Sequence, residues 1–144
     1  MIYTPLTKAA MRLCFAAHRD QVDRAGLPYV FHPFHVAEQM EDELTAVTAL
    51  LHDVLEDTAC TLEALRDMGY PPEVLEALSL LTHDKDVPYL EYVMKLRQNA
   101  IARAVKMADL RHNMDLSRLD HVSERDVLRL EKYKEALRLL EESE

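Results

Sequence analysis

The stretch LLHDVLEDT, residues 50–58, places four titratable side chains inside the most apolar part of the chain. These side chains are His52, Asp53, Glu56 and Asp57. The apolar residues around them predict a central helix over about 44–57. At about 100° per residue, His52 and Glu56 lie one turn apart on this helix, with Asp53 and Asp57 beside them. The pattern therefore predicts one polar strip on an otherwise buried helix.

Charged groups in such a strip need compensation. A buried carboxylate must be paired, hydrogen-bonded or bound to a metal, and four crowded groups repel one another unless a cation intervenes. A divalent metal is the simplest compensation, and imidazole with carboxylate suits Mn²⁺, Fe²⁺ or Zn²⁺. The alternative is that the strip faces water, which is usual for a helix carrying Asp and Glu. The apolar residues on both sides of His52 and Asp53 disfavour that alternative.

Further ligands must come from other segments, because two adjacent residues do not complete a coordination shell. His32, in YVFHP, stands just before a second predicted helix, although a lone histidine is more often structural. Asp109, in VKMADLRHN, has Val105 and Ala108 as neighbours on an apolar helix face, which points it inward. A buried Asp109 would need a partner, and a metal would be one. The remaining histidines are not assigned as ligands: His18, interpreted as structural, and His35, His83, His112 and His121.

The rest of the chain predicts an all-α fold. Its 144 residues are 49% apolar with only 2 glycines, and good helix formers predominate. We expect one compact domain over residues 1–144, built from seven or eight helices. The first predicted helix starts at Pro5 after a Thr4 cap, and the second lies in HPFHVAEQM. Further helices are predicted over about 44–57, 61–68, 72–81, 88–96 and 99–114. The last predicted helix follows a Ser123–Asp126 capping box.

Charge and cysteine content limit the classes of function. The net charge of −9 argues against general binding to DNA or RNA, but a few placed cations or a metal still allow a small phosphorylated ligand. Cys14 and Cys60 lie far apart and predict buried reduced thiols of a cytoplasmic protein. No stretch resembles a signal peptide or the roughly 18 apolar residues of a membrane span. The oligomeric state is left open.

Three motifs resemble one family. The pair His32-Pro33, the stretch LLHDVLEDT at 50–58 and the stretch VKMADLRHNM at 105–114 resemble the HD-domain metal-dependent phosphohydrolases. More narrowly, together with GLPYVFHP, they resemble the (p)ppGpp hydrolase domain of bifunctional alarmone synthetase/hydrolases and the small alarmone hydrolases. The resemblance covers about residues 6–116. It implies an all-helical enzyme that releases pyrophosphate from the 3′ position of (p)ppGpp or a related nucleotide.

The resemblance also implies roles for single residues. The positions that match the family's four metal ligands, which usually bind Mn²⁺ with Fe²⁺, Zn²⁺ or Mg²⁺ as alternatives, are His32, His52, Asp53 and Asp109. The positions that match the acidic pair orienting or activating the attacking water are Glu56 and Asp57. Arg24 and Asn113 match positions that contact the substrate. Lys106, one turn before Asp109, is a further candidate for a phosphate contact, although a solvated lysine is the favoured interpretation.

Two departures from the family pattern keep other functions open. Asp23, in VDRAG, stands where alarmone hydrolases usually carry the first of two basic residues that help to hold the guanine base. Leu116 replaces a small polar residue. One alternative is therefore an HD phosphohydrolase acting on another nucleotide or a phosphomonoester. A non-catalytic nucleotide-sensing module is a second, which the retention of Glu56 and Asp57 disfavours, and a structural helical adaptor would leave the buried charges unexplained.

Overall fold

The computed structural model describes residues 1–142, and the last two residues of the predicted domain, Ser143 and Glu144, lie outside the described residues. Within that range the only β pairing is an isolated bridge between Val22 and Pro28, so the all-α prediction is confirmed. The helices are α1 (Pro5–Ala17), α2 (Phe31–Glu38), α3 (Glu43–Leu51), α4 (Val54–Asp57), α5 (Leu62–Asp67), α6 (Pro72–Leu81), α7 (Tyr89–Leu96), α8 (Ala100–Asn113), the 3₁₀ helix η1 (Leu116–Arg118) and α9 (Glu124–Glu141).

Side-chain caps set the helix starts that the sequence predicts. Thr4 caps α1 through a reciprocal capping box with Thr7. The Thr61 side chain caps α5, and Ser123 with Asp126 forms a second capping box at the start of α9. Such caps satisfy backbone N–H groups that have no partner within the helix, which is why they mark its beginning.

One predicted helix is divided into two. The expected helix over 44–57 ends as α3 at Leu51 and resumes as the single turn α4. Between them, the backbone N of His52 lies 3.5 Å from the carbonyl oxygen of Ala49, and its ring Nδ1 lies 2.5 Å from the same oxygen. This contact to the residue three positions back tightens the turn and ends the regular helix.

The break separates the four titratable residues of the opening stretch. His52 is buried, and Asp53 precedes α4 with its side chain 15% exposed. Glu56 and Asp57 lie on α4 and are exposed. The expectation of one polar strip on a buried helix is therefore wrong: the His52–Asp53 pair faces the interior, and the acidic pair lies nearer the solvent.

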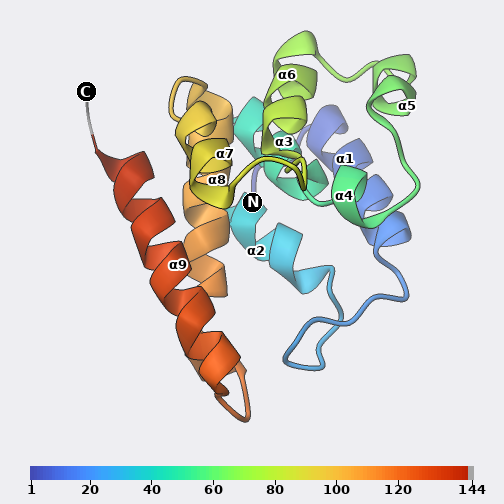
Figure 1. The fold of residues 1–144 in the computed structure, drawn as a ribbon. Helices are drawn as coiled ribbons and strands as arrows, with labels where there is room; N and C mark the ends of the chain where they lie inside the picture. Colours follow the sequence, from blue (N-terminus) through green and yellow to red (C-terminus); the bar gives the residue numbers. More distant parts are fainter. Residues whose placement is uncertain (143–144) are drawn as a thin grey trace.

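Helix α3 lies at the centre of the molecule, in contact with α1, α2, α6 and α8 (Figure 1). Helix α9 runs along α7 and α8 on one side of the molecule (Figure 1). The largest fully buried side chains include Leu50 and Leu51 of α3 and Leu110 of α8. Asp109 precedes Leu110 and is only 5% exposed, so its predicted inward orientation is confirmed. The central helix and α8 thus bring polar side chains into the protein interior.

Two further observations concern the cysteines and the length of the helices. Both cysteines are free, but only Cys14 is buried, so the prediction of two buried thiols is wrong for Cys60. Among the helices of residues 1–142, none combines the length and the apolar character needed to cross a bilayer.

Candidate metal centre and active site

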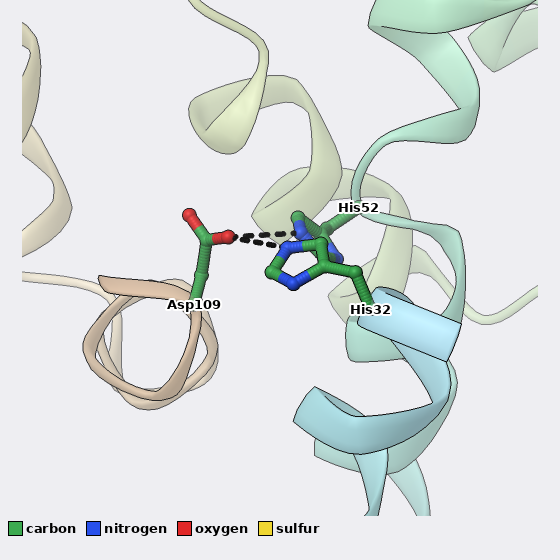
Figure 2. Close-up of side chains that lie close together, drawn as sticks. All are labelled: His32, His52 and Asp109. Carbon is green, nitrogen blue, oxygen red and sulfur yellow. Dashed lines mark hydrogen bonds and ion pairs between the residues drawn. The ribbon is translucent and has the colours of Figure 1, made fainter. Parts of the chain in front are cut away.

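Three buried side chains from different helices converge at one point (Figure 2). His32 lies in the first turn of α2, His52 follows the last residue of α3, and Asp109 lies on α8. One ligand atom of each lies within 4.8 Å of the others. The Asp109 Oδ1 atom is 2.8 Å from His32 Nε2 and 3.5 Å from His52 Nε2.

Asp53 adds a fourth group to this cluster. Its Oδ2 atom lies 3.1 Å from His52 Nε2 and 3.8 Å from His32 Nε2. Nitrogen and oxygen ligands bind Zn²⁺-sized ions at about 2.0–2.2 Å, which places neighbouring ligand atoms roughly 3.0–3.5 Å apart. The spacing of His32, His52 and Asp109 fits ligands around one cation, and Asp53 lies against both imidazoles. The fold thus brings three of the four predicted ligand positions to one point and places the fourth, Asp53, beside them.

The bonding of His52 tests whether these residues suit a metal. Its Nδ1 atom must carry a proton, because it lies 2.5 Å from a carbonyl oxygen, which only accepts hydrogen bonds. Its Nε2 atom is buried and makes no hydrogen bond within the described residues, although Asp53 Oδ2 is 3.1 Å away. A buried nitrogen that faces two carboxylates without a bond needs a positive charge between them. The donor set fits one divalent metal with a preference for nitrogen and oxygen ligands.

The pKa values of these groups lead to the same conclusion. Burial alone would raise the pKa of Asp53, but the neighbouring His52 outweighs it and the pKa falls to about 2. Burial would likewise raise the pKa of Asp109, but Lys106, followed by the two histidines, holds it well below its usual value. Burial would lower the pKa of His52, whereas Asp53 and Asp109 raise it well above the usual value. The site therefore favours a bound positive charge, whether a proton or a metal ion.

A second set of side chains contacts three of the four candidate ligands, Asp53, Asp109 and His32. The Tyr29 hydroxyl donates to Asp53 Oδ2, and the Asn113 amide donates to Asp109 Oδ1 at 3.1 Å. His112 Nδ1 lies 2.7 Å from His32 Nδ1. Sequence reasoning missed Tyr29 and assigned His112 no role. The only available signal was that His112 lies one turn after Asp109 on the same helix.

Lys106 lies in a buried environment. Its side chain is 14% exposed, and its Nζ lies 2.9 Å from Asp109 Oδ2 and 5.7 and 5.5 Å from the ring centres of Tyr89 and Tyr92. Burial would lower the pKa of Lys106, but Asp109 outweighs it and raises the pKa well above the usual value. The favoured interpretation of a solvated lysine is wrong, because the charged amine is paired inside the protein.

Glu56 and Asp57 lie on the short helix that begins after Asp53. Glu56 Oε1 accepts a hydrogen bond of 2.5 Å from the backbone N–H of His83. Burial, with Asp53 as a further cause, raises the pKa of both carboxyls above their usual values. Carboxylates with raised pKa values are better proton acceptors, and these two are open to solvent, so either can take a proton from a water molecule.

A pocket of about 540 Å³ adjoins the cluster. Tyr29, His32 and Asn113 line it and also belong to the ligands or their partners, so the pocket leads to the candidate metal position. Its charged lining residues are three arginines, Arg24, Arg118 and Arg129, and three aspartates, Asp23, Asp115 and Asp126. The predicted substrate contact Arg24 lines the pocket and forms an ion pair with Asp126 at the start of α9. Guanidinium groups beside apolar side chains suit the phosphates and the organic part of a phosphorylated molecule.

The departure at Asp23 has a structural explanation. Its Oδ1 accepts hydrogen bonds from the backbone N–H groups of Ala25 and Leu27 at 2.9 and 3.0 Å, which closes the loop before α2. Its Oδ2 lies 3.4 Å from Arg118 Nη1. The carboxylate is thus occupied by the loop and by Arg118, and Leu116 lines the same pocket. Asp23 adds no uncompensated negative charge to the pocket.

Comparison with known proteins places this arrangement in a family. No protein-family model matches the chain. A GTP pyrophosphokinase of Myxococcus xanthus is 33% identical across 78% of this chain and 17% of its own length. The mouse guanosine-3′,5′-bis(diphosphate) 3′-pyrophosphohydrolase MESH1 is 33% identical across 72% of this chain and 66% of its own length. The bifunctional (p)ppGpp synthase/hydrolase SpoT of Escherichia coli K12 is 34% identical across 68% of this chain and 16% of its own length.

The fold agrees with these relatives. A solved structure of a metazoan orthologue of SpoT, described as hydrolysing ppGpp, superposes with a TM-score of 0.78 at 26% identity and covers 98% of this chain and 88% of that chain. The chain spans about two thirds of MESH1 and less than a fifth of the longer relatives. The all-helical architecture, the buried histidine–aspartate cluster and these relatives together place the chain in the HD-domain phosphohydrolase superfamily. Within that superfamily the chain belongs to the family of the MESH1 and SpoT (p)ppGpp hydrolases.

Proposed function

We propose that this protein is a metal-dependent phosphohydrolase that releases pyrophosphate from the 3′ position of (p)ppGpp or a related nucleotide. The observation that carries the proposal is the convergence of His32, His52 and Asp109 at one buried position, with Asp53 against both imidazoles, beside a pocket that includes three arginines. The names of the MESH1 relatives give the reaction, and the matching fold supports its transfer to this chain.

In this proposal the four converging residues hold one divalent metal, with Mn²⁺ as the expected ion. When bound, such a metal lowers the pKa of a coordinated water and polarises a phosphoryl group. Glu56 or Asp57 accepts the proton of the attacking water, since both carboxyls lie next to the ligand segment and have raised pKa values. Asp53 and Asp109 stay ionised because their pKa values are lowered.

The pocket residues position the substrate. The guanidinium groups of Arg24 and Arg118 line the pocket and suit the phosphates or the base of a nucleotide. Asn113 lies between the pocket and Asp109, to which it donates a hydrogen bond of 3.1 Å. Lys106 was a candidate for a contact to the substrate phosphates. In this proposal it pairs with Asp109 instead, because its amine already forms that ion pair. Four expectations stay predictions: a small nucleotide as partner, no binding to nucleic acid, a cytoplasmic location and a single domain over residues 1–144.

The decisive experiment measures release of pyrophosphate from ppGpp by Mn²⁺-loaded protein, with Asp53→Ala as the control that loses a ligand. Release by the wild type that vanishes in Asp53→Ala supports the proposal. No release by a wild type that still binds Mn²⁺ rejects this substrate, and a screen of other nucleotides and phosphomonoesters then tests the alternative phosphohydrolase. Tight binding of ppGpp without turnover of any such compound would favour a nucleotide-sensing module.

A further inference from the structure

Three histidine rings form a row from the candidate metal position to the surface. The ring of His112 lies edge to edge with that of His32, with centroids 5.0 Å apart and planes at 11°, and stacks on His35, with centroids 4.0 Å apart and planes at 25°. His32 is buried, His112 is partly buried and His35 is exposed. Only His32 belongs to the cluster of candidate ligands, so the role of the other two rings is open.

The contact between His32 and His112 restricts where their protons lie. The two Nδ1 atoms are 2.7 Å apart, so one of them carries the proton and the other accepts it. His32 Nε2 faces Asp109 Oδ1 and the candidate metal position. A neutral imidazole that binds a metal through Nε2 must carry its proton on Nδ1. In that state His32 donates and His112 Nδ1 accepts.

The other histidine ligand is held in the same way by a different group. His52 Nδ1 is fixed by the carbonyl oxygen of Ala49, which leaves Nε2 to face the carboxylates. Within residues 1–142, His112 is the one hydrogen-bond partner of His32 Nδ1. Metal-bound histidines generally donate their second N–H to such an acceptor, which fixes the ring and its tautomer. His112 Nδ1 is thus the acceptor for His32 Nδ1, as the Ala49 carbonyl oxygen is the acceptor for His52 Nδ1.

We propose that His112 is a positioning residue that accepts a hydrogen bond from His32 Nδ1 and so keeps the lone pair of His32 Nε2 directed at the metal. The inference rests on the metal site of the proposed function. Helix α8 then supplies both a ligand, Asp109, and, one turn later, the group that orients another ligand from α2. A shift of α8 against α2 would disturb both groups together.

The test compares three variants by their affinity for Mn²⁺, measured by electron paramagnetic resonance titration. His112→Phe keeps an aromatic ring in the stack but removes the acceptor, and we expect its Mn²⁺ affinity to fall about 10- to 100-fold. His112→Gln restores an acceptor oxygen and should recover most of the affinity. His35→Phe is the matched control, because it replaces the outer ring of the stack and leaves His32 and His112 unchanged.

A second readout follows the tautomer of His32 and requires no variant. Long-range ¹H–¹⁵N spectra of wild-type protein loaded with diamagnetic Zn²⁺ should place the His32 proton on Nδ1 and the metal on Nε2. Binding of the metal through His32 Nδ1 would overturn the inference even if His112→Phe fails to fold. So would a folded His112→Phe protein that binds Mn²⁺ as tightly as the wild type.

The outcomes separate this inference from the proposed function. A wild type that binds Mn²⁺ but releases no pyrophosphate from ppGpp defeats the proposed substrate and leaves the role of His112 standing. A wild type that binds no Mn²⁺ defeats the metal site, and with it the inference. Equal Mn²⁺ affinity in the wild type and folded His112→Phe defeats only the inference.

Discussion

Asp53 contacts several groups of the candidate site through a single carboxylate oxygen. One of its oxygens, Oδ2, faces both His52 and His32 and also accepts the hydrogen bond of the Tyr29 hydroxyl. Burial, and then Asp53, raises the pKa of Tyr29, which therefore stays protonated and remains a donor. A ligand that is fixed in this way loses less conformational freedom when a metal binds.

We expect Tyr29→Phe to weaken Mn²⁺ binding by about 10- to 100-fold, because the variant keeps the ring and loses the hydrogen bond to Asp53. Titration with Mn²⁺ at constant pH measures the effect. Tyr70→Phe is the control, since Tyr70 is buried between α5 and α6, away from the site. Unchanged Mn²⁺ affinity in Tyr29→Phe would show that the hydroxyl does not position Asp53.

Glu56→Gln should retain Mn²⁺ and lose turnover by about 10²- to 10⁴-fold, because the amide cannot accept a proton. The pKa of Glu56 is raised, so the wild-type rate should fall with decreasing pH on a limb that lies above the usual carboxyl pKa of about 4.3. The limb reports protonation of the base, and the residual activity of Glu56→Gln should lack it.

Exposed Glu63 on α5 provides the matched control. Glu63→Gln should keep both the rate and the pH profile of the wild type. If Glu56→Gln is fully active, Glu56 is not the base and Asp57 becomes the remaining candidate.

Among the elements, α9 connects the pocket to the rest of the bundle. The carboxylate of Asp126 is part of the capping box with Ser123 and also pairs with Arg24 from the loop before α2. Hydrogen bonds from Ser123, together with Arg24, lower the pKa of Asp126 below its usual value, so the carboxylate is ionised near neutral pH. The start of α9 thus fixes a residue that lines the pocket.

Ser123→Ala should lower the free energy of unfolding by about 1 kcal/mol, because it removes the N-cap acceptor of α9. Urea denaturation followed by circular dichroism measures the change. Ser79→Ala is the matched control: Ser79 lies inside α6, where its hydroxyl bonds to the carbonyl of Glu76 and alanine is favoured. Equal stability of the two variants would contradict a stabilising cap.

For the whole molecule, the candidate metal centre joins segments that are distant in sequence. His32 belongs to α2, His52 follows α3 and Asp109 belongs to α8, and these three helices pack against one another (Figure 1). In the proposed function, a metal bound by all three would hold the native arrangement and would have no comparable site in the unfolded chain. Metal binding and folding should therefore be coupled.

At free Mn²⁺ about 100-fold above its dissociation constant, the coupling should add about 2.7 kcal/mol to the free energy of unfolding. For a chain of this size that corresponds to a rise in Tm of roughly 5–10 °C, which a chelator should reverse. Thermal denaturation with and without Mn²⁺ measures the shift. Asp53→Ala should show little or no shift, and an equal shift in that variant would place the stabilising ion elsewhere.

The sequence by itself determined the helical architecture and the composition of the candidate site. Caps at Thr4, Thr61 and Ser123 are local signals, so the helix starts were predicted. The inward direction of Asp109 followed from the helical period, and the resemblance supplied the ligand set. The helix starts and the direction of Asp109 depend on neighbours within one or two turns, which the sequence displays directly.

Only the tertiary structure decided how these residues are held. The break after α3, the pairing of Lys106, and the bonds of Tyr29 and His112 depend on packing that no local pattern encodes. His112 and His32 are 80 residues apart, and Arg118 meets Asp23 across 95 residues. A polar group buried by folding must find a partner wherever the chain brings one. That partner is fixed by the packing of whole helices, which is why the sequence predicted the candidate ligands and the fold showed which groups contact them.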